Sequence, residues 1–323
     1  MTDGTKYKPL TRAQSKLIDA SVAIFGEQAT KKDAAFLARE LVQATLPHKN
    51  PGDVPLWKRT NGNLTLAIQP GMNIKTGKSY GYPYGTIPRL LLFWMTTEAA
   101  RNKGRGCENP RRLELGRTLS GFMVELGLDP NRGGKRSDAR RLREQMERLF
   151  QAKMSFHKHE QAENRAGHAW LNMDVAPEGE LWWNPKRPEH GALWGSWIEL
   201  GQRFYEAITA APVPVDIRAL KALKRSPLAL DLYSWLTYEA FRAHKSGKPR
   251  YETWAQLHAH VGGEYGRLDN FRRKAKAALL KIGNIYPDLK LGTKQGGIEI
   301  LPESYPALQP RRMTIDGTCN RQG

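Results

Sequence analysis

Basic residues dominate the stretch 131–150, which has the sequence NRGGKRSDARRLREQMERLF and holds seven basic residues against three acidic ones. Leu142, Met146 and Leu149 follow one another at i, i+4 and i+7, the spacing of a single helical face. The opposite face then carries cations, which bind phosphates and pair with the guanine edge in duplex DNA. The basic residues are Arg132, Lys135, Arg136, Arg140, Arg141, Arg143 and Arg148.

A second basic stretch, residues 269–285, repeats this pattern. With Ala275 facing inward at 100° per residue, Asn270 and Arg273 lie on the outer face of the predicted helix. Arg pairs with guanine and Asn with adenine through two hydrogen bonds, and each good pair contributes about 1–3 kcal/mol of discrimination. Lys276 lies beside this pair, and the flanking cations, which suit phosphates, are Arg272, Lys274 and Lys281.

Other patterns could indicate enzyme chemistry. The segment GMNIKTGKS at 71–79 resembles a phosphate-binding loop, but five residues separate its glycines where the motif has four. His157 and His159 resemble the metal pair of rolling-circle nucleases, but Lys158 stands between them, and a basic DNA-contacting hairpin is the alternative. Four tryptophans, Trp182, Trp183, Trp194 and Trp197, could stack bases or pack between domains. We expect no catalytic residue, no metal and no cofactor.

The composition agrees with a polyanionic partner. The chain has 323 residues and a net charge of +19, from 51 Lys and Arg against 32 Asp and Glu. No apolar run is long enough to span a membrane, and the N-terminal residues lack the apolar core of a secretory signal. Two cysteines are too few for a four-cysteine metal site. We expect a cytoplasmic protein that binds no membrane.

Further elements must position the two basic stretches. A short apolar helix, Leu119 to Leu126, ends at Gly127 before the first one, and two strands near 152–158 and 168–175 follow it. The remaining predicted elements are helices at 11–25, 31–46, 89–102, 217–223, 227–243 and 254–261, a strand at 63–69, and a hairpin at 289–292 and 298–301.

The two basic stretches belong to an internal repeat of about 134 residues. Leu119, Phe122 and Leu126 correspond to Trp254, Leu257 and Val261 at an offset of 135 residues. Each copy runs helix, helix, basic helix, hairpin, which is typical of winged-helix domains. We predict an α+β, mostly helical fold with two tandem winged-helix domains, at 1–190 and 191–310, and a flexible tail at 311–323.

Several longer motifs resemble the plasmid-encoded RepA replication initiators, especially those of broad-host-range plasmids of the IncW type. The resemblance covers roughly residues 40–305. It rests on LPHKNPG at 46–52, NGNLTLAIQPG at 61–71, GYPYGTIPRLLLFWMTTEA at 81–99, LELGRTLSGFM at 113–123, RLREQM at 141–146, PVPVDIRAL at 212–220 and SPLALDLYSWL at 226–236.

This resemblance implies an initiator that binds direct repeats (iterons) at a plasmid origin. It also implies opening of an adjacent AT-rich segment, recruitment of the host DnaA protein and DnaB helicase, and a monomer–dimer balance that limits copy number. Two alternatives remain open from the residues alone: a winged-helix repressor of transcription, and a rolling-circle nickase.

Related two-headed initiators commonly read most of their sequence with the C-terminal head. We therefore expect the helix at 269–285 to contact bases, and the stretch at 131–150 to supply phosphate contacts and a dimer switch. The predicted DNA-binding residues are Arg136, Arg140, Arg141, Arg143, Arg267, Asn270, Arg272, Arg273, Lys274, Lys276 and Lys281.

Overall fold

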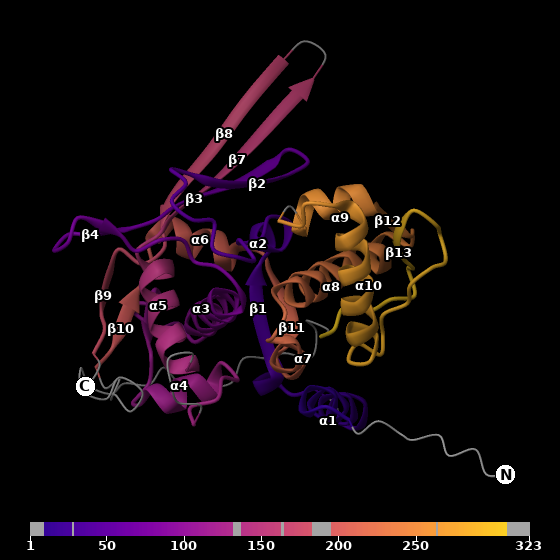
Figure 1. Cartoon of the computed structure of the whole chain (residues 1–323), viewed down its shortest axis with the longest axis horizontal. Coiled ribbons are helices and arrows are strands. Elements are labelled where there is room, and N and C mark those ends of the chain that lie inside the picture. Colours follow the sequence, from indigo (N-terminus) through magenta and orange to yellow (C-terminus); the bar gives the residue numbers. More distant parts are fainter. Residues whose placement is uncertain are drawn as a thin grey trace.

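The computed structural model describes residues 10–27, 29–131, 137–162, 165–182, 195–262 and 264–308. Two groups of helices with small sheets lie on either side of the antiparallel pair β1 (Ala34–Ala38) and β11 (Pro212–Asp216) (Figure 1). The fold is thus mixed α and β, as predicted, and helix outweighs strand in the described residues.

The N-terminal group carries the first basic stretch. Its long helix α3 (Thr86–Gly104) is buried along most of its length and packs against α5 (Asp138–Phe150). The Thr118 hydroxyl accepts a hydrogen bond from the Gly121 N–H and caps α4 (Leu119–Glu125). The Ser137 hydroxyl caps α5 in the same way. Because each cap satisfies a free N–H at a helix start, α4 and α5 form as separate helices on either side of a turn.

A four-stranded antiparallel sheet, in the order β2-β3-β7-β8, follows α5. The strands β7 (Lys153–Ala162) and β8 (Arg165–Asp174) extend beyond β2 (Trp57–Asn61) and β3 (Leu64–Gln69) as a hairpin that projects from the body (Figure 1). The strand predictions at 63–69, 152–158 and 168–175 are confirmed, with a longer hairpin than the sequence indicated.

The C-terminal group repeats the order of elements. The predicted helices at 217–223 and 254–261 are confirmed with the same bounds, as α7 (Ile217–Leu223) and α9 (Trp254–Val261). The predicted hairpin at 289–301 is only partly formed, because β13 (Gly297–Ile300) pairs mainly with β12 (Arg250–Thr253) and makes one bridge to Leu291. The long helices of this group are α8 (Pro227–Ser246) and α10 (Leu268–Gly283).

The predicted helix at 31–46 is wrong. The chain there forms a 3-10 turn (Lys31–Asp33), strand β1 and the short helix α2 (Arg39–Gln43). The apolar run AAFLA fits both a buried helix and a buried strand, so periodicity does not decide between them. Pairing with β11, about 180 residues away along the chain, decides for the strand.

The remaining elements complete the two groups. The helix α1 (Arg12–Gly26) packs on α7, and the Ser21 hydroxyl donates a hydrogen bond to the Asn284 carbonyl at 2.6 Å. The others are β4 (Met72–Asn73), β5 (Lys78–Ser79), β6 (Arg112–Glu114), β9 (Glu178–Glu180), β10 (Trp197–Glu199) and α6 (Gln202–Ala210).

A buried charged network joins the two groups. The Arg89 guanidinium on α3 makes two hydrogen bonds to the Asp231 carboxylate on α8, at 2.7 and 2.8 Å, and His48 Nε2 donates to the same carboxylate at 2.8 Å. All three side chains are buried. Burial alone would raise the pKa of Asp231, but the charge of Arg89 and the hydrogen bonds from His48 and Arg89 hold it well below its usual value. Asp231 is therefore ionised and neutralises Arg89 inside the protein.

A second ion pair ties this network to the turn between α9 and α10. Glu264 accepts hydrogen bonds from the backbone N–H groups of His48 and Lys49, and from the Arg59 guanidinium at 2.9 Å. Arg59 lies on β2 and is buried. The second basic helix is thus held at its start by residues of the N-terminal group.

Candidate nucleic-acid interface

The helix α10 presents the most cationic surface among the elements predicted to bind DNA. It contains five basic residues and a single acidic one, Asp269. Phe271, Ala275, Ala278 and Ile282 are buried, at i, i+4, i+7 and i+11. This stripe turns the predicted contact residues of α10 outward. Asn270, Arg272, Arg273, Lys274, Lys276 and Lys281 are all exposed, as is Arg267 just before the helix.

Asn270 and Arg273 lie side by side on this outer face. The Arg273 guanidinium donates a hydrogen bond to the Asn270 side-chain oxygen at 3.1 Å. This contact orients the two side chains whose bidentate geometry suits adenine and guanine.

Most of the cations around this pair are not neutralised by a nearby carboxylate. The Arg272 guanidinium lies 5.9 Å from the centre of the Trp254 ring. Arg267 is 3.7 Å from Asp269, in a pair that is more than four-fifths exposed and thus strongly hydrated. Within the described part of the chain, Lys274, Lys276 and Lys281 have no carboxylate within 4.0 Å. These residues can neutralise phosphates on both sides of a groove.

The turn before α10 depends on a close approach at Gly262. A Cβ atom at this position would lie 2.4 Å from a ring carbon of Phe271, which is fully buried on the inner face of α10. We expect Gly262→Ala to lower the free energy of unfolding by about 1–3 kcal/mol, because the buried ring has no room to move.

Gly266 in the same turn is the matched control, since a Cβ atom there meets nothing within 4 Å. Urea unfolding of Gly262→Ala and Gly266→Ala measures the difference, and equal midpoints would show that the contact with Phe271 is unimportant.

The basic residues of α5 are more fully compensated than those of α10. This helix holds four basic and three acidic residues. Arg141 pairs with Asp138 at 3.3 Å and the exposed Arg140 approaches Glu144 at 3.9 Å. Arg143 is half-buried, and Arg136 lies outside the described residues. The structure thus brings Arg140 and Arg141 to the surface of α5, with a smaller charge surplus than α10.

The projecting hairpin carries an exposed row of rings. His157 and His159 on β7 share one face with His168 and Trp170 on β8. His168 lies between the other two imidazoles, with ring centres at 5.2 and 4.6 Å in stacked arrangements. The described residues contain no group of three or more His, Cys, Asp or Glu that could hold a metal ion. His157 Nδ1 lies 3.0 Å from His168 Nε2, so these two imidazoles are hydrogen-bonded to each other. The row can contact bases or phosphates.

The sequence interpretation missed two residues of this surface. Trp170 is 64% exposed on the hairpin, and its alternation with His168 in a strand is a signal that could have found it. Glu264 anchors the turn before α10, but an isolated acidic residue in a turn gives no comparable signal.

Of the four tryptophans considered for base stacking, Trp182 is exposed and the ring of Trp197 has its centre 4.0 Å from the Arg112 guanidinium. Trp183 and Trp194 lie outside the described residues.

The segment 71–79, which resembles a phosphate-binding loop, forms the small hairpin of β4 and β5. A phosphate-binding loop instead leads from a strand into a helix.

Among the described helices, none combines the length and the hydropathy that crossing a membrane requires.

The sequence model of the family described as plasmid-encoded RepA protein matches residues 82–256, more than half of the chain. The chain belongs to this family. The RepA match runs from the start of α3 through α5, the hairpin and α8 into α9, so it includes the first basic helix. The family assignment places the chain among plasmid replication initiators and confirms the resemblance found in the sequence.

Two solved structures are similar to this RepA chain, both of RctB. The crystal structure of selenomethionine derivatives of RctB domains 2 and 3 aligns to this chain with a TM-score of 0.46 and 12% sequence identity. The alignment covers 87% of this chain and 100% of the RctB chain. A second structure, of RctB domains 2–3, aligns with a TM-score of 0.42 and 10% sequence identity, covering 81% of this chain and 94% of the RctB chain. No curated protein matches the chain significantly.

Proposed function

We propose that this initiator binds the direct repeats (iterons) of a plasmid replication origin as duplex DNA, with α10 reading bases in the major groove. The exposed Asn270–Arg273 pair within a strongly cationic helix face carries the proposal. The helix α5, through the exposed Arg140 and Arg141, and the β7–β8 hairpin supply phosphate contacts.

We also propose that the two groups of helices act as tandem winged-helix units. In each, a long helix, a short strand, a short helix and a basic helix follow in order, and then the hairpin β7-β8 in the first unit (α3-β6-α4-α5-β7-β8) and the single strand β13 in the second (α8-β12-α9-α10-β13). In the second unit β12 pairs with β13, whereas in the first β6 pairs with β10. Two reading heads on one chain cover a longer repeat than one head could and bind it more tightly.

In this proposal the protein acts by binding and not by chemistry of its own. It opens the adjacent AT-rich segment, recruits the host DnaA protein and DnaB helicase, and passes between monomer and dimer. A footprint on origin DNA tests the first step: regularly spaced protected direct repeats are expected. Protection of a single palindrome would instead indicate a dimeric repressor, and a nick with a covalent tyrosyl link would indicate a nickase.

Arg273→Ala and Lys281→Ala separate base reading from phosphate binding. We expect Arg273→Ala to cost about 1–3 kcal/mol on the cognate repeat and to reduce the preference over random duplex. Lys281→Ala should weaken both duplexes about equally, because phosphates carry no sequence information. Fluorescence anisotropy with the two duplexes measures both effects. Equal losses on cognate and random DNA for Arg273→Ala would refute its role in reading bases.

A further inference from the structure

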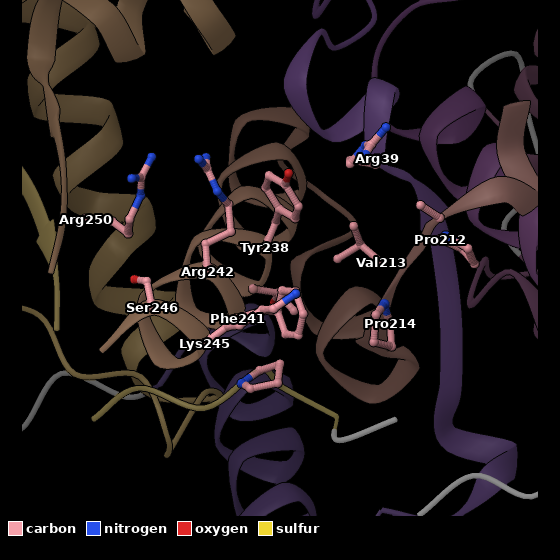
Figure 2. A pocket seen from close by; sticks show the side chains of 13 residues that line it. Arg39, Pro212, Val213, Pro214, Tyr238, Phe241, Arg242, Lys245, Ser246 and Arg250 are labelled. Carbon is pink, nitrogen blue, oxygen red and sulfur yellow. The ribbon is translucent and has the colours of Figure 1, made fainter. Parts of the chain in front are cut away.

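A cavity of about 660 Å³ lies between β11, the C-terminal half of α8 and β12 (Figure 2). Its size falls within the usual range of ligand pockets, roughly 300–1,000 Å³. None of the residues that line it belongs to α5, α10 or the β7–β8 hairpin. It is therefore separate from the surface proposed to bind DNA.

The cavity combines apolar walls with cations. Val213, Pro214 and Phe241 contribute apolar surface, and Phe241 is 41% exposed although it is a large aromatic residue. Arg39, Arg242, Lys245 and Arg250 also line the cavity, and no acidic residue does. In Figure 2 the guanidinium groups of Arg242 and Arg250 lie near each other, on the same side as the Tyr238 hydroxyl. A ligand that fits must carry both an apolar group and negative charge.

The charge balance shows how much negative charge the cavity can accept. Arg242 and Arg250 share one carboxylate, Glu239, at 2.8 and 3.0 Å, so the pair keeps a positive surplus. Lys245 has its ammonium 5.9 Å from the Phe241 ring and no carboxylate partner in the described part of the chain. Arg39 is paired with Glu40 at 2.9 Å, and Glu252 on β12 lies near enough to the Arg250 charge to offset part of the surplus. Four lining cations against Glu40, Glu239 and Glu252 leave one net positive charge, at the unpaired Lys245, which suits a short acidic segment better than the continuous charge of a nucleic acid strand.

The adjoining strand edge excludes one way of binding a peptide. Phe36 on β1 lies opposite Pro214 on β11, but the Phe36 N–H donates to the Thr97 hydroxyl and not to β11. The backbone nitrogen of Pro214 therefore points away from β1, toward the open edge of β11. Pro212 and Pro214 have no N–H there, and the N–H of Asp216 already donates to the Tyr233 hydroxyl. Because β11 offers no free donor at these positions, a partner strand cannot extend the sheet and must be held by its side chains.

From this geometry we propose that the cavity binds a short acidic segment of a partner protein. One bulky apolar side chain of the segment enters between Phe241 and Val213, and flanking carboxylates meet Arg242, Lys245 and Arg250. The proposal does not depend on DNA binding, because the two surfaces share no residue.

Selection of peptides from a random 12-residue library displayed on phage, against the full-length protein, tests this proposal. Enriched peptides should carry Asp or Glu on both sides of a Leu, Phe or Trp. Labelled with fluorescein, they should bind Phe241→Ala and Lys245→Glu at least tenfold more weakly than the wild type in anisotropy titrations. Lys245→Gln, which places no acid at the end of α8, should weaken binding in the same direction.

Lys103→Glu is the matched control, since Lys103 is exposed at the end of α3 and lies outside the cavity. It should leave peptide affinity unchanged, and thermal unfolding confirms that each variant is folded. Failure to enrich any peptide, enrichment without the acidic and apolar pattern, or equal binding by Lys245→Glu and Lys103→Glu would each overturn the proposal. So would displacement of the peptides by single-stranded (dT)12 that itself binds in a Lys245-dependent manner. Origin duplex binding, measured on the same variants, should be retained, so failure of this proposal and failure of the DNA-binding proposal remain distinguishable.

Discussion

Replacement of Asp231 by alanine is expected to lower the free energy of unfolding by about 3–5 kcal/mol. The substitution leaves the Arg89 guanidinium, which is only 4% exposed, without its counter-charge. Arg89 would keep its hydrogen bonds to the carbonyl groups of Leu46, Pro47 and Gly85. These carbonyls are dipoles and cannot neutralise a buried cation. His48 would lose the acceptor for its Nε2 as well.

Urea unfolding of Asp231→Ala measures this loss, and a double variant shows its origin. In Asp231→Ala with Arg89→Met neither charge of this pair remains, so we expect the double variant to be more stable than Asp231→Ala alone. Glu114→Ala is the surface control, because Glu114 pairs with Arg112 at an exposed site and should cost at most about 1 kcal/mol. A loss for Asp231→Ala no larger than that of the control would contradict the role given to the network.

The affinity for origin duplex is expected to fall by about 10³–10⁵ between 50 and 200 mM salt if six to ten phosphates are neutralised. The exposed cations of α10 and α5 are numerous enough for this, and each released counterion adds to the salt slope. Removal of one phosphate contact, as in Lys274→Ala or Lys276→Ala, should reduce the slope by about 1.

Anisotropy titrations at four or five salt concentrations give the slope for each variant. Lys103→Ala is the control, because Lys103 lies outside the proposed interface and its loss should leave the slope unchanged. A slope near zero for the wild type would rule out the proposed phosphate contacts of α10. So would a Lys276→Ala variant that binds clearly more weakly but has the same slope as Lys103→Ala.

The helices around the candidate site could be predicted because their signals are local. α9 has the predicted bounds since Thr253 and Gln256 form a capping box at its start and Gly262 follows its end. The exposed face of α10 could be predicted for the same reason, because the spacing of Phe271, Ala275 and Ile282 fixes which side is buried.

The features that join the two groups of helices could not be predicted in this way. Strand β1 depends on β11, and the Arg89–Asp231 pair links residues 142 positions apart. The apolar spacing of each helix predicts that helix without reference to the other. It does not show that Arg89, buried in one apolar helix, pairs with Asp231, buried in another. Only the three-dimensional packing shows that these contacts cross the predicted domain boundary near residue 190, which itself stays a prediction.

The pairing of β1 with β11 has a consequence for synthesis of the chain. At ~5–20 residues per second, the ribosome makes β11 on the order of 10–40 s after β1. During this time the apolar segment AAFLA at 34–38 has emerged without its partner strand. An unpaired apolar strand is a template for pairing with other chains. The nascent protein thus passes through an interval in which aggregation competes with folding, and chaperone binding near residues 34–38 would protect it until β11 appears.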